Sequence, residues 1–312
     1  MRIALALALL LATALPASAG PRVVRVQKGL PGQWPGLALV PDDAEAIGFL
    51  SLAPVTAWAE KQGASHVDIM DGLAGTVVGP DVPHELITRG TRSLLVAVAT
   101  SANRPGSSGG SMTTGLIILG GSYDERALEA ALASAFPFSE RVAGRALYLR
   151  RSGRREPEVI ALLPGGIAFG DQVWVKAAVT RLGKLDARPE SAPARVARQR
   201  IAPAAVAWGA LSPGRGTRAQ LAPIKPFLAT IEGALWMTAP RAEPHATLSL
   251  RLSFATPGNA REAASFASQL FGLSGPFAAG GSGLDAILMG AVGTLAGALR
   301  VEGSDVVADV SR

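Results

Sequence analysis

One short motif has the form of a catalytic sequence. Residues 106–110 read Gly-Ser-Ser-Gly-Gly, which satisfies the G-x-S-x-G pattern of hydrolases with a nucleophilic serine. That chemistry needs a strand directly before the serine and a helix directly after it. Ser108 instead lies in a Gly- and Ser-rich run, 104–111, which leads into a second apolar strand. This composition favours a flexible hairpin loop, and a catalytic Ser108 is kept only as an alternative.

Histidines and carboxylates in the first third of the chain could in principle bind zinc or manganese. His66 and His84 lie close together in the sequence, and the carboxylates around them are Asp68, Asp71, Asp81 and Glu85. Their spacing matches no ligand motif, so polar surface residues are the simpler interpretation. The third histidine, His245, precedes an alternating strand and is expected at an exposed edge.

The remaining chemistry is sparse. Asp42 and Asp43 form a carboxylate pair, but they follow Pro41 directly before a strand, which is ordinary turn sequence. The chain has no cysteine, which excludes thiol chemistry and zinc–thiolate sites. We therefore assign no catalytic, cofactor-binding or metal-binding residue, expect no cofactor, and favour a non-catalytic protein over an enzyme.

The first nineteen residues predict export. Arg2 supplies a positive start, residues 3–15 are uncharged and apolar, and Ala17-Ser18-Ala19 forms a small-x-small cleavage site before Gly20. The apolar run is shorter than a spanning helix requires, which favours a cleaved signal peptide over an anchor. Without cysteine no acyl anchor can be attached. We expect a periplasmic or extracellular protein that is not lipid-anchored and has no transmembrane segment after cleavage.

Charge is distributed in two blocks. Residues 42–85 contain eight acidic residues and one lysine, a net charge of −7, whereas residues 141–200 contain thirteen basic and five acidic residues, a net charge of +8. A basic block can bind an anionic lipid, a polysaccharide or an acidic protein. Alternatively, the two blocks face each other or only solubilise two surfaces. Nucleic acid is not expected, because only Tyr148 and Trp174 could stack bases near the basic residues.

The pattern of apolar residues predicts an α+β fold. The composition, 48% apolar and 17% charged, is that of a compact globule. Each half reads as strand, helix, strand, strand, helix, strand, which predicts two related halves with mainly antiparallel sheets. Strands are expected at 47–52, 93–100, 114–120, 146–150, 158–163, 166–170, 204–211, 234–238, 247–255, 299–302 and 306–310. Helices are expected through Val55, Trp58 and Ala59, at 124–135, after Asp171, at 220–231, after Asn259 and at 284–299.

These elements give the domain boundaries. The signal peptide spans 1–19, an extended N-terminal tail 20–40, the first half 41–184, a linker or short helix 185–203, and the second half 204–312. Trp34 in the tail either packs back on the domain or is an exposed anchor for a partner.

These observations favour one function over two others. The favoured one is an exported, soluble envelope or periplasmic protein that is non-catalytic and binds a protein or an anionic surface. The alternatives are a metal-dependent or serine hydrolase, using His66 and His84 or Ser108, and a carrier of an apolar ligand. The oligomeric state cannot be read from the sequence.

Overall fold

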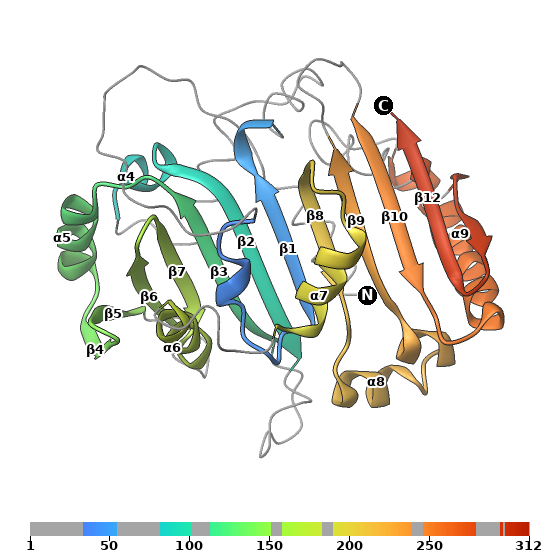
Figure 1. Ribbon diagram of the computed structural model, residues 1–312, viewed down its shortest axis with the longest axis horizontal. Coiled ribbons are helices and arrows are strands. Elements are labelled where there is room, and N and C mark those ends of the chain that lie inside the picture. The colour runs from blue at the N-terminus through green and yellow to red at the C-terminus, as the bar shows by residue number, and fades with distance from the viewer. Residues whose placement is uncertain are drawn as a thin grey trace.

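The described strands join in one sheet. The computed structural model describes residues 34–54, 82–100, 113–150, 158–182, 190–238, 246–278, 294–295 and 297–311. Within these ranges, twelve strands form one sheet in the order β11-β12-β10-β9-β8-β1-β2-β3-β7-β6-β5-β4 (Figure 1). Neighbouring strands are antiparallel. The fold is therefore α+β with an antiparallel sheet.

The first half supplies seven strands and the helices around them. Its elements are η1 (Leu37–Leu39), β1 (Ala46–Ser51), α4 (His84–Thr88), β2 (Thr91–Thr100), β3 (Thr113–Gly121), α5 (Glu125–Ala135), β4 (Phe138–Val142), β5 (Arg145–Arg150), β6 (Glu158–Leu163), β7 (Gly166–Asp171) and α6 (Gln172–Arg181).

The second half supplies five strands. Its elements are α7 (Ala192–Arg200), β8 (Ala205–Leu211), α8 (Arg215–Leu221), η3 (Pro226–Thr230), β9 (Glu232–Thr238), β10 (Thr247–Ser253), α9 (Pro257–Ala278), β11 (Arg300–Glu302) and β12 (Asp305–Ser311).

The two halves follow the same path through the sheet. In the first, β1, β2 and β3 are neighbours, and after α5 the chain returns so that β7 pairs with β3. In the second, β8, β9 and β10 are neighbours, and after α9 the chain returns so that β12 pairs with β10. The halves meet where β1 pairs with β8, which makes a single sheet and leaves neither of these strands as an open edge.

Helices cover the two faces of the sheet unequally. On the face that we call the front, α6 and α7 pack with η1 over a cluster centred on Trp174, Trp208 and Phe49 (Figure 1). On the back face, α4 and α5 cover the strands of the first half. Helix α9 packs on the back of the second half, against Leu252 and Val306. Among the described residues, no helix is long and apolar enough to cross a membrane.

Aspartates cap the starts of α5 and α6; the sequence predicted this for Asp171, whereas Asp124 was expected within the first turn. Asp124 accepts a hydrogen bond from the backbone N–H of Ala127, and Asp171 accepts from Val173 and Trp174. The helix expected at 220–231 is two elements instead. Helix α8 ends at Leu221, and a 3-10 turn begins at Pro226, because Pro223 and Pro226 cannot continue an α-helix.

Residues 34–40 are folded, whereas the sequence predicted an extended tail over 20–40. They form a turn and η1, and Trp34 is only 7% exposed. Its ring lies 4.9 Å from that of Trp208, so this tryptophan packs back on the domain. The sequence also missed β4, the edge strand, whose side chains are mostly exposed or half-buried. Residues 1–33, most of the predicted helix at 284–299, and the segment around Trp58 lie outside the described residues.

Candidate functional site

The residues singled out for catalysis or metal binding are not assembled into a site among the described residues. His66, His245 and Ser108 lie outside them, and His84 begins α4 in the connection between β1 and β2. Across the described ranges, no group of three or more histidine and carboxylate side chains could hold a metal ion.

Asp42 and Asp43 anchor a helix as well as forming a turn. Asp42 makes an ion pair with the buried Arg181 at the end of α6. Asp43 Oδ2 accepts a hydrogen bond from the Trp174 indole N–H at 3.2 Å. Both carboxylates therefore fix α6 against the start of β1, and the Asp42 ion pair joins the acidic block to the basic block.

Much of the basic block is neutralised within the protein. Eight of its thirteen basic residues are described, and four of these make ion pairs. Besides Arg181 with Asp42, these pairs are Arg150–Glu158, Lys176–Glu140 and Arg198–Glu190. The hydrogen bond from Lys176 also holds the pKa of the Glu140 carboxyl below its ordinary value. This part of the block is less available to an anionic partner than its formal charge indicates.

A different polar region lies where β1 and β2 of the first half meet α8. Glu45 is 4% exposed, yet its carboxylate has several donors. Its Oε1 accepts from the Gly214 N–H and the Thr217 hydroxyl, both at 2.7 Å. Its Oε2 accepts from the backbone N–H and the hydroxyl of Thr100, both at 3.0 Å. A buried charge is tolerable only when it is satisfied in this way.

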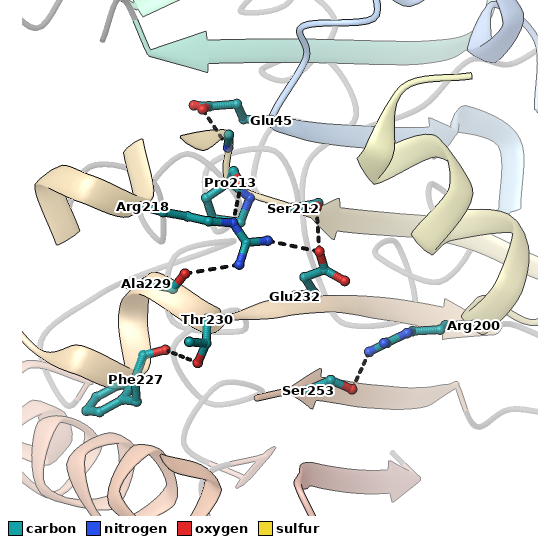
Figure 2. Close-up of polar contacts among 11 residues, drawn as sticks. Glu45, Arg200, Ser212, Pro213, Arg218, Phe227, Ala229, Thr230, Glu232 and Ser253 are labelled. Atoms are coloured by element: carbon teal, nitrogen blue, oxygen red, sulfur yellow. Dashed lines mark hydrogen bonds and ion pairs between the residues drawn. The ribbon is translucent and has the colours of Figure 1, made fainter. Parts of the chain in front are cut away.

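One turn along α8, Arg218 joins three segments of the second half (Figure 2). Its Nε donates to the Pro213 carbonyl at 2.7 Å, and its Nη1 to the Ala229 carbonyl at 3.0 Å. Its Nη2 lies 2.9 Å from Glu232 Oε1, which also accepts from the Ser212 hydroxyl. The guanidinium thus fixes the β8–α8 loop and η3 to the start of β9.

Glu232 belongs to a row of polar side chains that crosses five neighbouring strands. Glu232 is opposite Ser253, Ser253 is opposite Asp305, and Asp305 is opposite Glu302. We call Ser212, Glu232, Ser253, Asp305 and Glu302 the polar row. Because paired residues of adjacent strands point to the same face, these side chains lie together on the front.

Hydrogen bonds hold the middle of the polar row. The Ser253 hydroxyl accepts from Arg200 Nη1 at 2.7 Å and donates to Asp305, whose other oxygen accepts from Arg251 Nε at 2.8 Å. Burial acts to raise the pKa of the Asp305 carboxyl, but the hydrogen bonds from Ser253 and Arg251 and the charge of Arg200 hold it below its ordinary value. Asp305 is therefore a stable anion at neutral pH.

A second group of charges lies beside the row. Arg251 of β10 and Arg300 of β11 lie opposite Val307 of β12, on its two sides, and Val307 is only 6% exposed. Arg300 binds Asp309 at 3.0 Å and Glu302 at 2.8 Å. A hydrogen bond from Ser249, with a further one from Arg300, lowers the pKa of Asp309 against the effect of burial. We call the polar row together with Ser249, Arg251, Arg300 and Asp309 the charged front surface.

The outer charged side chains of the front surface are exposed, whereas Ser212 and Ser249 are buried beneath them. Helix α7 packs on β1, β8 and β9, and α9 lies on the opposite face of the sheet. Figure 1 shows α7 in front of β8 and β9, and no helix in front of β10 and β12. The side chains of Arg251, Arg300, Glu302 and Asp309 are each 52–54% exposed. This arrangement offers fixed hydrogen-bond donors and acceptors to a partner that binds across the strands.

The sequence alone indicated part of the charged front surface. The alternation in 247–255 predicted a half-buried strand, and its polar members include Ser249, Arg251 and Ser253. Their partners lie on β9, β11 and β12, and the register between these strands could not be read from the sequence.

Comparisons with known proteins do not assign the chain to a family. No family model and no curated protein matches it. A crystal structure of TP0453 (crystal form I) resembles it with a TM-score of 0.42 and 11% sequence identity, over 89% of this chain and 94% of that chain. A similarity this distant carries no inference about activity or ligand.

Proposed function

We propose that this chain is an exported protein of the periplasm or the extracellular envelope that works without catalysis, by binding a protein partner. The observation that carries the proposal is the charged front surface, an open face of the sheet whose arginines and carboxylates are held by ion pairs across the strands. The N-terminal pattern of a positive start, an apolar run and a small-residue cleavage site supports export.

Pre-fixed side chains favour binding for an entropic reason. An arginine that is immobile before association loses less conformational freedom when a partner docks. Arginine is also enriched in the well-packed parts of protein interfaces. On the charged front surface, Arg251 and Arg300 are held by Asp305, Glu302 and Asp309, so their guanidinium planes are set before a partner arrives.

A protein fits this surface better than an anionic membrane or polymer. Each exposed arginine of the surface lies against a carboxylate, and its four carboxylates outnumber its two arginines, so the surface has no uncompensated positive charge. A polyanion is attracted by uncompensated charge. The basic block also favours a protein over a polyanion, because half of its described basic residues are already in ion pairs within the chain.

Affinity chromatography on immobilised mature protein tests the proposal. Native envelope extract is passed over wild type, over Arg251→Gln/Arg300→Gln, and over the control Arg126→Gln/Arg261→Gln, whose exposed arginines lie on α5 and α9. The same protein should be retained by wild type and control, and at least about tenfold less by the surface variant. Equal retention by all three would refute the charged front surface as the binding site. In a separate assay, strong co-sedimentation of the protein with phosphatidylglycerol vesicles would favour the anionic-membrane alternative.

A second candidate function, an apolar-ligand carrier, is favoured by the middle of the back face. There Gly48 is opposite Gly209, and Val96 and Leu235 flank this glycine pair in the same row, both half-buried. Leu250 continues the row. Aliphatic side chains around two glycines form an apolar surface of the kind that binds an acyl chain. Native mass spectrometry of the purified protein should then detect a co-purified lipid, and its absence after incubation with fatty acid would exclude this function.

We also infer that the halves arose by internal duplication. The common path of β1-β2-β3 with β7 and of β8-β9-β10 with β12 supports this inference. The first half returns through four strands and the second through two, so an insertion or a loss must have followed.

A further inference from the structure

We propose that Glu45, a residue of the first half, positions the charged front surface of the second half by holding α8. Its effect on binding rests on the function proposed above, whereas its effect on α8 stands on the contacts alone. Glu45 is a positioning residue in this scheme, because it lies directly before β1 and reaches the surface only through other residues.

The first step is the capping of α8 by a residue from the other half. Gly214 occupies the N-cap position of α8 and, as a glycine, supplies no side chain to cap the helix. Glu45 Oε1 instead accepts from the Gly214 N–H and from the Thr217 hydroxyl, both at 2.7 Å. A carboxylate also suits the positive end of the helix dipole.

The second step ties this cap to the first half. Glu45 Oε2 accepts from the Thr100 N–H and hydroxyl, and the hydroxyls of Thr100 and Thr217 contact each other. The backbone of Glu45 adds two bonds, from its N–H to the Val98 carbonyl and from the Ser212 N–H to its carbonyl. With the carboxylate fixed from both sides, α8 has little freedom to rotate or slide.

The third step runs from α8 to the surface. Arg218 directly follows Thr217 on α8 and binds Glu232 as well as the Pro213 and Ala229 carbonyls. Glu232 is a member of the polar row and is opposite Ser253. Figure 2 shows the contacts of Arg218 with Pro213, Ala229 and Glu232, with Ser253 on the strand next to Glu232. A displaced α8 would move the guanidinium away from Glu232 and open that end of the row.

Hydrogen exchange of the free, full mature protein tests the positioning role. Glu45→Gln keeps the shape of the side chain but replaces one acceptor oxygen by an N–H₂ donor, which faces N–H or O–H donors in either orientation. Amides in 214–221 and 226–232 should exchange at least about tenfold faster, while β5 and β6 stay unchanged. Thr217→Val should give the same pattern with a smaller change, and the control Glu85→Gln, an exposed carboxylate on α4, should give none.

The outcomes separate this inference from the proposed function. Unchanged exchange in 214–221, or a uniform increase over the whole chain, would overturn the positioning role. If exchange rises as expected, Glu45→Gln should also retain less partner in the chromatography above. Faster exchange with full partner retention would uphold the positioning role and overturn the charged front surface as the docking site.

Discussion

Replacing Trp34 by alanine tests whether the segment before β1 belongs to the folded core. The side chain is 7% exposed and packs against Trp208. A buried tryptophan removes roughly 200 Å² from water, about 5 kcal/mol at about 25 cal/mol per Å², of which alanine keeps about 1 kcal/mol. The Trp34 indole N–H has no hydrogen-bond partner among the described residues, so no such bond is lost. We expect a loss of about 4 kcal/mol, in the range of core aromatic truncations.

The assay is urea unfolding of the purified protein followed by far-UV circular dichroism, because tryptophan fluorescence changes with the substitution itself. The midpoint should fall with an unchanged m-value. Phe138→Ala is the control, since Phe138 is 59% exposed on β4 and should change stability by less than about 1 kcal/mol. A loss below about 1 kcal/mol for Trp34→Ala would refute the packing of this segment.

Three further predictions concern stability. Burial raises the pKa of the Tyr123 hydroxyl far above its ordinary value, so above pH about 10 this tyrosine ionises in the unfolded chain but not in the folded one. The free energy of unfolding should therefore fall by about 1.4 kcal/mol per pH unit above that pH. Tyr123→Phe should weaken this alkaline pH dependence in urea unfolding. The pKa of the Asp305 carboxyl is lowered in the folded protein, so its contribution to the free energy of unfolding is present above pH about 4 and is lost as the pH falls further. Asp305→Asn should weaken the acid dependence of stability in the same assay, and an unchanged acid dependence would contradict this role. Asp171→Ala removes the cap of α6 and should cost about 1 kcal/mol in thermal unfolding, whereas no change would mean that the cap adds nothing.

The sequence indicated the strands of both halves because most carry long apolar runs or a regular alternation. β6 and β7 are buried along their whole length, and β10 alternates, so their limits are close to those expected. β4 was missed because Phe138–Val142 is an edge strand with a mixed polar pattern. Its hairpin turns at Ala143 and Gly144, which both have positive φ, and alanine in place of the usual Asn, Asp or Gly at the first position leaves only a weak sequence signal.

Long-range contacts account for what the sequence could not show. Trp34 is an isolated aromatic residue in a Gly- and Pro-rich stretch, and its partner Trp208 is far along the chain. Glu45 belongs to the acidic block by sequence, yet it is buried because donors from β2 and α8 surround it. The charged front surface depends on the register of β9, β10, β11 and β12, which composition does not encode.

Site-specific photocrosslinking in the cells that produce the protein tests the central claim most directly. A photoreactive phenylalanine analogue replaces Glu302, which is 54% exposed in the polar row, or Glu129, an exposed residue of α5, as the control. Binding through the charged front surface should give a discrete protein adduct from position 302 and none from position 129. Adducts of equal yield from both positions, or from position 129 alone, would contradict it.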